Sequence, residues 1–205
     1  MKSYIRIIFL SIIGATPVAT YYINPFELQT ENIRPRISGH DVYRIPSKSM
    51  LPTLAPGDYI ITSNIAYKTT TPKKGDIIVF NRISKKDSNK LIPYIKRVIA
   101  TAGDTFSIKQ GIVFINNTPL KESYLDPENV KRAYSRFQPQ RTIPEGMIFV
   151  LGDNRDNSAD SRIFGFVAIS DVIAQATTLI FGKDKQSWKS LETQSEVENK
   201  NMRNP

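Results

Sequence analysis

The sequence predicts a mostly β protein, with a compact β-barrel-like or β-sheet domain that follows one N-terminal transmembrane helix. Beyond about residue 41, short runs of β-branched and aromatic residues recur, and Gly, Pro, Asn and Asp separate them. No apolar pattern with a helical period is sustained in that part of the chain, and no internal repeat is present. The N-terminal segment, by contrast, is uncharged and apolar.

The N-terminal helix is predicted from residues 7–26, which carry no charge and are strongly apolar in their first half. This length suffices to cross a bilayer. A cleaved signal peptide is the alternative, but the small residues that cleavage requires are poorly placed, so we expect an uncleaved anchor over residues 1–26. Lys2 and Arg6 precede the span and Glu27 follows it, which favours a C-terminal domain outside the membrane.

After a linker at 27–40, residues 41–182 are expected to form a β-rich domain. Its predicted strands lie at residues 59–62, 76–80, 106–108, 112–115, 147–151 and 172–181, with turns at 109–111 and 116–117. Residues 84–90 and 126–141 are expected to be peripheral, and residues 183–205, which include Trp188, to be a polar tail. The sequence assigns no role to residues 126–141.

The composition restricts the possible chemistry. The chain has no cysteine, which excludes disulfide bonds and cysteine-based zinc or redox sites. His40 is the one histidine and lies in a polar stretch, so we expect a surface residue and neither a metal site nor another cofactor. The basic residues behind the net charge of +9 are interleaved with acids. Beside an apolar N-terminus, this charge favours contact with membrane lipid, and nucleic acid is not an expected partner.

The most unusual segment is a polar loop, Gly152-Asp153-Asn154-Arg155-Asp156-Asn157-Ser158-Ala159-Asp160-Ser161-Arg162, between apolar runs at 147–151 and 164–167. Short polar side chains at this density form turns, because they bond to nearby backbone groups. A polar loop between apolar runs must satisfy its groups internally or serve a site. Alone, it fits a surface turn with Asp–Arg pairs equally well.

Two further segments precede the loop. Residues 45–54 read Ile-Pro-Ser-Lys-Ser-Met-Leu-Pro-Thr-Leu, and residues 94–99 read Tyr-Ile-Lys-Arg-Val-Ile, followed by Ala-Gly-Asp at 102–104. In this order the segments resemble type I signal peptidase (leader peptidase), from about residue 43 to residue 166. The resemblance implies a membrane-bound serine endopeptidase that cleaves signal peptides from exported preproteins with a Ser-Lys dyad and no cofactor. It also implies a single-pass protein of the bacterial plasma membrane, with its catalytic domain on the extracytoplasmic side.

Residue chemistry alone makes Lys96 a candidate base. Lysine can activate a serine if burial lowers its pKa from about 10.4 toward the working pH. In a strand, Lys96 points away from Arg97, and residues 77–79 and Val98 are available as apolar surroundings. The same pattern more often describes a solvated lysine, because lysines are rarely buried. The resemblance reverses that balance.

Ser49 is the candidate nucleophile. Ser47 and Ser49 are two residues apart, so in an extended segment both hydroxyls face the same way and Lys48 faces the other. This geometry suits an oxyanion hole made by the Ser49 N–H and the Ser47 hydroxyl. Lys48 departs from the family pattern, in which a small residue is usual at this position.

The resemblance assigns the remaining roles position by position. Ser49 corresponds to the nucleophile, Lys96 to the general base and Ser47 to the oxyanion donor. Ser158 corresponds to a serine that hydrogen-bonds the base. The other assignments are a supporting ion-pair cluster of Asp160, Arg162 and Arg97, and an apolar substrate-binding surface of Ile45, Met50, Leu54, Tyr94 and Ile95.

Three other functions are alternatives to this one. A related processing peptidase of a conjugation or specialised secretion system would tend to depart from the loop sequence, which is intact here. An inactive membrane-anchored binder of exported chains fits poorly with the presence of both Ser49 and Lys96. Nucleic-acid binding lacks a visible platform of aromatic and basic residues.

Overall fold

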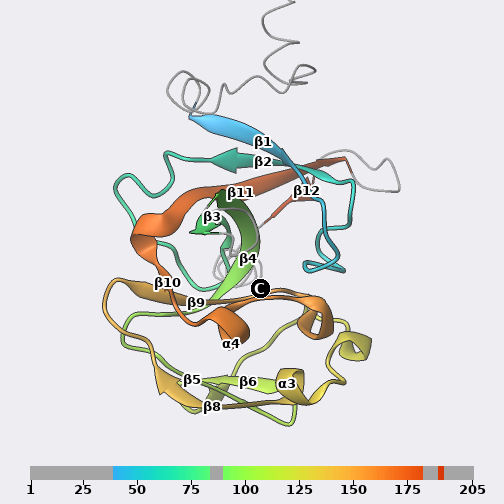
Figure 1. Cartoon of the computed structure of the whole chain (residues 1–205), viewed down its shortest axis with the longest axis vertical. Helices are drawn as coiled ribbons and strands as arrows, with labels where there is room; N and C mark the ends of the chain where they lie inside the picture. The colour runs from blue at the N-terminus through green and yellow to red at the C-terminus, as the bar shows by residue number, and fades with distance from the viewer. Residues whose placement is uncertain (1–38, 84–89, 182–188, 192–205) are drawn as a thin grey trace, which may run out of the picture.

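The computed structural model describes residues 39–83, 90–181 and 189–191. Within these ranges the chain is mostly β and its strands pair antiparallel in two sheets, which confirms this part of the predicted fold class (Figure 1). The expected membrane helix, the linker before residue 39 and Trp188 lie outside the described residues. No helix in the described ranges has the length and apolarity needed to cross a membrane.

The larger sheet has eight strands and carries most of the predicted site. Its order is β1 (His40–Arg44), β2 (Tyr59–Ser63), β11 (Val172–Phe181), β3 (Ile77–Ile83), β4 (Leu91–Thr101), β9 (Met147–Leu151) and β10 (Val167–Ala168), while β12 (Lys189–Ser190) pairs with β11. The last long strand, β11, therefore lies between β2 and β3. Edge strands β1 and β10 have no pairing with each other in the described ranges, so hydrogen bonds do not close the sheet into a barrel.

The smaller sheet has four strands in the order β7 (Thr118–Pro119), β6 (Ile112–Ile115), β5 (Thr105–Lys109) and β8 (Phe137–Thr142). The turns predicted at residues 109–111 and 116–117 are confirmed. Gln110 and Gly111 between β5 and β6, and Asn116 and Asn117 between β6 and β7, all adopt positive φ, as tight hairpin turns require. Strand β8 lies within the stretch that we expected to be peripheral. Its side chains are mostly exposed, so it carries no apolar alternation that would predict it.

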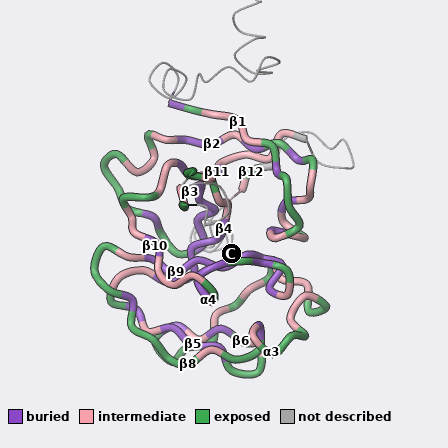
Figure 2. Tube along the Cα trace, in the orientation of Figure 1, coloured by how far each residue is buried: buried purple, intermediate pink, exposed green. Residues whose placement is uncertain are grey.

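Three apolar clusters hold these layers together. Buried residues are concentrated along the inner strands, such as β4 and β9 (Figure 2). One cluster fills the space between β9 and the smaller sheet, where the rings of Phe106 and Phe149 lie 4.0 Å apart. A second contains Phe80 and Val98. The third, which includes Met50 and Leu54, anchors the connection between β1 and β2. Burial of each such side chain contributes about 1.5–3 kcal/mol relative to exposure, so these clusters fix where the polar segments lie.

Strand β4 runs through the centre of the molecule. It pairs with β3 on one side and with β9 on the other, and Lys96 lies opposite Ile78 of β3. Residues 96–100 are buried, because both neighbouring strands and the apolar clusters cover them. The strand thus carries a lysine and an arginine into the interior, where each charge requires a partner.

Candidate functional site

Ser49 lies on the connection between β1 and β2. The two ends of the connection are joined, because Ile45 N–H donates to Asp58 O and Gly57 N–H donates to Ile45 O, both at 2.8 Å. A turn inside it is closed by Leu54 N–H, which donates to Met50 O at 2.9 Å. Buried Met50 and Leu54 fix its inner side. Ser49 is therefore placed by main-chain hydrogen bonds and apolar anchors rather than by a long helix or strand.

The hydroxyls of Ser47 and Ser49 face each other, with their Oγ atoms 3.1 Å apart. The two hydroxyls converge as expected, but the backbone reason differs. Residues 47–53 form a bend and a turn rather than an extended segment, and Leu51 N–H donates to the Lys48 carbonyl at 3.2 Å. Ser47 and Lys48 are exposed, whereas Ser49 is half-buried. The Ser47 hydroxyl therefore lies at the open side of the site, beside the Ser49 oxygen.

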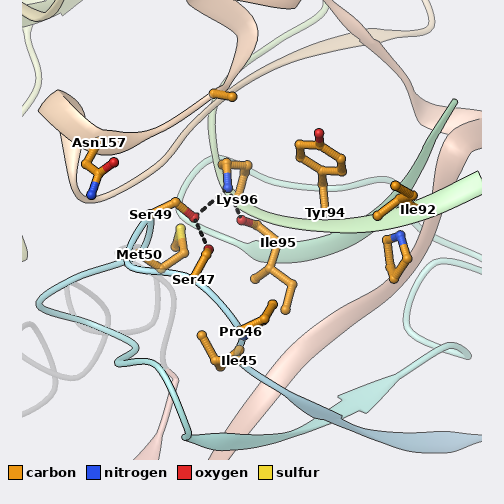
Figure 3. Close-up of a pocket in the computed structure, with 12 residues that line it drawn as sticks. Ile45, Pro46, Ser47, Ser49, Met50, Ile92, Tyr94, Ile95, Lys96 and Asn157 are labelled. Carbon is orange, nitrogen blue, oxygen red and sulfur yellow. Dashed lines mark hydrogen bonds between the residues drawn. The ribbon is translucent and has the colours of Figure 1, made fainter. Parts of the chain in front are cut away.

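Lys96 reaches Ser49 from β4. Its Nζ donates hydrogen bonds to Ser49 Oγ at 2.8 Å and to the carbonyl oxygen of Ile95 at 2.7 Å (Figure 3). The residue is only 4% exposed. The structure thus brings together the two residues that the sequence nominated as nucleophile and base.

The protonation state of Lys96 follows from two opposing effects. Burial lowers the pKa of the Lys96 ammonium to about 8, and the carboxylates of Asp160 and Asp153 oppose this shift. Each carboxylate is itself paired with an arginine, Asp160 with Arg162 and Asp153 with Arg97. Because the arginines offset the carboxylate charge, burial determines the direction of the shift. With its pKa at about 8, Lys96 is about one tenth neutral at pH 7, far more than a solvated lysine would be.

The supporting ion pairs are arranged differently from the single cluster expected of Asp160, Arg162 and Arg97. Asp160 accepts two 2.8 Å hydrogen bonds from the Arg162 guanidinium, and both side chains are fully buried. Asp160 also accepts from Gly152 N–H at 3.0 Å and caps the short helix α4 (Ser161–Phe164). These bonds fix the polar loop beside Lys96.

Arg97 belongs to a second ion pair, with Asp153. The guanidinium donates to the two Asp153 oxygens at 2.9 and 2.7 Å and to the Gly75 carbonyl at 3.0 Å. The Thr53 hydroxyl donates to the same carboxylate. Asp153 thereby joins the segment of Ser49 to the strand of Lys96. It stands in the loop sequence, but only its contacts distinguish it from the other polar residues there.

Ser158 lies near the site but does not hydrogen-bond Lys96. Its Oγ atom is buried and has no hydrogen-bond partner among the described residues. It packs against Gly152, where an added Cβ would lie 2.2 Å from Ser158 Oγ and 2.5 Å from the Ser49 carbonyl oxygen. The loop, Ser158 and the nucleophile segment are therefore in close contact.

A cavity of about 340 Å³ opens beside the Ser49–Lys96 pair. Its wall is largely apolar, with the polar groups gathered at one end, and includes four expected residues, Ile45, Met50, Tyr94 and Ile95. Leu54 does not line it; its side chain lies in the apolar cluster beneath, which includes Met50 and Ile60. Sequence reasoning missed Pro46, Ile92, Pro93, Asn157 and Ala159. Ile92 had a signal, since it shares the strand face of Tyr94 and Lys96 at a spacing of two.

Metal ligands are not gathered anywhere in the described ranges: no group of three or more His, Asp or Glu side chains could hold an ion there. His40 is exposed on β1. The site therefore offers a hydroxyl, an amine of lowered pKa and an open apolar cavity. Such a set can perform nucleophilic attack on an extended chain.

Comparisons with known proteins show which family this chain resembles. The protein-family model described as "Signal peptidase, peptidase S26" matches residues 36–181. The protein named "Probable signal peptidase I-1" of Synechocystis sp. is 38% identical over 153 residues, 72% of this chain and 73% of its own. Signal peptidase I of Bacillus caldolyticus is 37% identical over 142 residues, 65% of this chain and 75% of its own. A solved signal peptidase I from Enterococcus faecalis is 32% identical, with 53% of this chain and 98% of its own covered and a TM-score of 0.43.

Proposed function

The chain belongs to the signal peptidase family, peptidase S26, and from this premise we propose that it cleaves signal peptides from preproteins with Ser49 as nucleophile and Lys96 as general base. One observation carries the assignment of the two residues: Lys96 Nζ lies 2.8 Å from Ser49 Oγ in a buried setting. A base within hydrogen-bond reach of a hydroxyl is the first requirement for nucleophilic catalysis.

The reaction follows from the protonation state of Lys96. The neutral amine takes the Ser49 proton as Oγ attacks the scissile carbonyl, and Lys96 then gives this proton to the departing amine of the mature protein. Water, activated by the same lysine, releases the signal peptide from Ser49. The Ser47 hydroxyl and the Ser49 N–H are proposed to bind the negative oxygen that develops on the carbonyl, an interaction that contributes about 100- to 1,000-fold to the rate.

The apolar cavity is proposed to receive the residues before the cut. An extended peptide presents alternate side chains to one surface, so the first and third positions would face Ile45, Met50, Tyr94 and Ile95. A shallow apolar wall favours small side chains such as Ala and excludes large or charged ones. The second position would point away and tolerate many residues.

Membrane attachment is also proposed. Residues 7–26 supply an uncharged apolar anchor of sufficient length, and residues 27–40 a linker to the peptidase domain at 41–182, with a polar tail at 183–205. This arrangement would hold the domain outside the plasma membrane, next to the exported preproteins and the lipid. Protease protection of intact and permeabilised spheroplasts tests the orientation, and a digested domain only in permeabilised cells would contradict it.

The function is tested with the full chain in detergent, incubated with a preprotein whose cut is mapped by mass spectrometry. We expect one cut after a small residue, absent in Ser49→Ala and retained in the control Ser170→Ala, which alters an exposed serine. A second series varies the first and third positions before the cut. Cleavage with Leu or Lys at the first position as fast as with Ala would reject the assignment of the cavity.

A further inference from the structure

Residues 121–136, between β7 and β8, form a segment that we name the strap. It contains the turn η1 (Pro127–Asn129) and the short helix α3 (Ala133–Arg136), and it lies along the polar loop at 152–162 (Figure 1). The sequence assigns no role to most of this segment. Its contacts are directed at the loop, and they begin with two side chains near its start, Glu122 and Tyr124.

Glu122 neutralises Arg155, the central arginine of the loop. Arg155 NH1 donates to Glu122 at 3.2 Å, and NH2 donates to the other oxygen of the same carboxylate. The Arg155 side chain is 0% exposed and the Glu122 side chain 6% exposed. Removal of one member of such a buried pair leaves a charge without compensation, which strongly disfavours the observed geometry.

Tyr124 contacts Arg97, the arginine next to Lys96 in the chain. Its ring lies 3.9 Å from the centre of the Arg97 guanidinium, and its hydroxyl donates to Glu122 at 2.6 Å. Arg97 follows Lys96 in the chain and pairs with Asp153. Tyr124 therefore covers the Arg97–Asp153 pair with an aromatic face, a favourable position for a desolvated guanidinium.

The second half of the strap binds the loop through its own main-chain N–H groups and through the Ser135 hydroxyl. The Asp156 carboxylate accepts from the N–H groups of Lys131 and Arg132 at 2.7 and 3.0 Å. Ser135 Oγ donates to the Arg155 carbonyl at 2.9 Å and accepts from Arg162 at 3.1 Å. The strap thus contacts the middle and the end of the loop, as well as Arg97 beside its start.

The loop in turn contacts the nucleophile. Arg155 Nε donates to the Gly152 carbonyl at 3.1 Å, and Asn154 N–H donates to the Ser49 carbonyl at 3.1 Å. A chain of direct contacts therefore runs from Glu122 through Arg155 and the loop main chain to Ser49. We propose that the strap positions the Ser49–Lys96 pair, with Glu122 and Tyr124 as its positioning residues. The catalytic part of this inference rests on the proposed function.

The experiment uses the full chain in detergent and three substitutions in the strap. Glu122→Gln removes the charge that Arg155 needs, whereas Tyr124→Leu removes the ring and Tyr124→Phe keeps it. Glu128→Gln is the matched control, because Glu128 lies in the same strap but is 75% exposed and pairs with Lys131. Amide hydrogen exchange of peptides covering residues 49–54 and 152–157 is measured alongside kcat and KM for a preprotein.

In Glu122→Gln we expect exchange in these two regions to rise about 10-fold, with the sheets unchanged. We expect kcat to fall about 10- to 100-fold and KM to stay within about 3-fold, because small misplacements of reacting groups act on the chemical step. Tyr124→Leu should show the same pattern. Tyr124→Phe should lose less kcat than Tyr124→Leu, because it keeps the ring against Arg97 and removes only the hydrogen bond to Glu122. Glu128→Gln should remain within about 3-fold of the wild type.

Unchanged exchange and kcat in Glu122→Gln would overturn the proposal, as would an increase in exchange spread evenly over the domain. If Glu122→Gln does not fold, the comparison of Tyr124→Leu with Tyr124→Phe decides, and equal kcat values would reject the positioning role. A wild type that cuts no preprotein would reject the proposed function instead. The exchange measurement would still show whether the strap holds the loop.

Discussion

The ammonium nitrogen of Lys96 lies 2.8 Å from the hydroxyl oxygen of Ser49, and the two residues are 47 positions apart in the chain. Their contact is therefore a product of the tertiary fold and not of local backbone structure. The pair depends on a turn segment fixed by buried Met50 and Leu54, and on a central strand whose burial lowers the pKa of the lysine.

Replacement of either residue tests the dyad. Ser49→Ala and Lys96→Met should each reduce kcat by several orders of magnitude, because removal of one member of a nucleophile–base unit removes the function of both. Lys109→Met, which alters an exposed lysine of β5, should retain wild-type turnover. Turnover of Lys96→Met above about one hundredth of wild type, measured with a preprotein, would contradict the assignment.

The pH dependence of cleavage should follow the titration of Lys96. The base must be neutral to accept a proton, and its pKa is lowered to about 8 by burial. We expect kcat/KM to rise with pH and to level off above about 8, measured over a range in which the fold is intact. A profile that rises only near pH 10 would indicate a solvated lysine.

The same shift makes a prediction about stability. The pKa of Lys96 falls from 10.5 in the unfolded chain to about 8 in the folded protein. Below about pH 8 the lysine is charged in both states, so burial of the charge reduces the free energy of unfolding by its full amount. This reduction decreases as the pH rises above 8 and disappears near pH 10.5. The full reduction is on the order of 3 kcal/mol. Lys96→Met should therefore gain stability relative to wild type at pH 7, and the gain should shrink by pH 10. Urea unfolding at pH 7 and pH 10 measures the free energy of unfolding of both proteins. The same difference between Lys96→Met and wild type at the two pH values would refute the prediction.

Gly152→Ala should impair the site by direct contact. The new Cβ would lie 2.5 Å from the Ser49 carbonyl oxygen, a main-chain atom that cannot rotate away. Overpacking of this kind costs about 1–3 kcal/mol of stability. Here it also displaces the nucleophile, so kcat of the folded variant should fall, beyond any loss of activity that comes from a smaller folded fraction. Gly146→Ala is the control: its Cβ meets nothing within 4 Å, and only its positive φ is strained. Equal kcat values in the two variants would contradict the proposed contact.

The sequence predicted the parts of this protein that local chemistry determines. Alternating β-branched runs and the turn residues Gln110 and Asn116 have local signatures, and the strands and hairpin turns follow them. Ser47, Ser49 and Lys96 stood in recognisable segments. Strand β1 was missed because its five residues begin and end with polar side chains and contain no run of strand formers longer than two. Strand β8 was missed because its exposed, polar residues carry no periodic signal.

Partners across the fold were harder to predict. The pairing of Arg97 with Asp153 and of Arg155 with Glu122 depends on which strands become neighbours, and several acids were equally available in the sequence. Leu54 was expected at the substrate surface, but an apolar residue near a site looks the same in sequence whether it lines the cavity or the core below. Such choices are made by three-dimensional packing.

The place of β11 between β2 and β3 has a consequence for biosynthesis. The connection between β1 and β2 carries Ser49. Among the described strands, β2 is linked by hydrogen bonds to β3 and β4 only through β11. The ribosome synthesises β11 after the whole polar loop. A ribosome-bound chain that has emerged only as far as β9 therefore holds Ser49 and Lys96 without the strand that connects their two halves. Long-range pairing of this kind forms late, so under the proposed mechanism proteolytic activity begins only when synthesis of the domain is nearly finished.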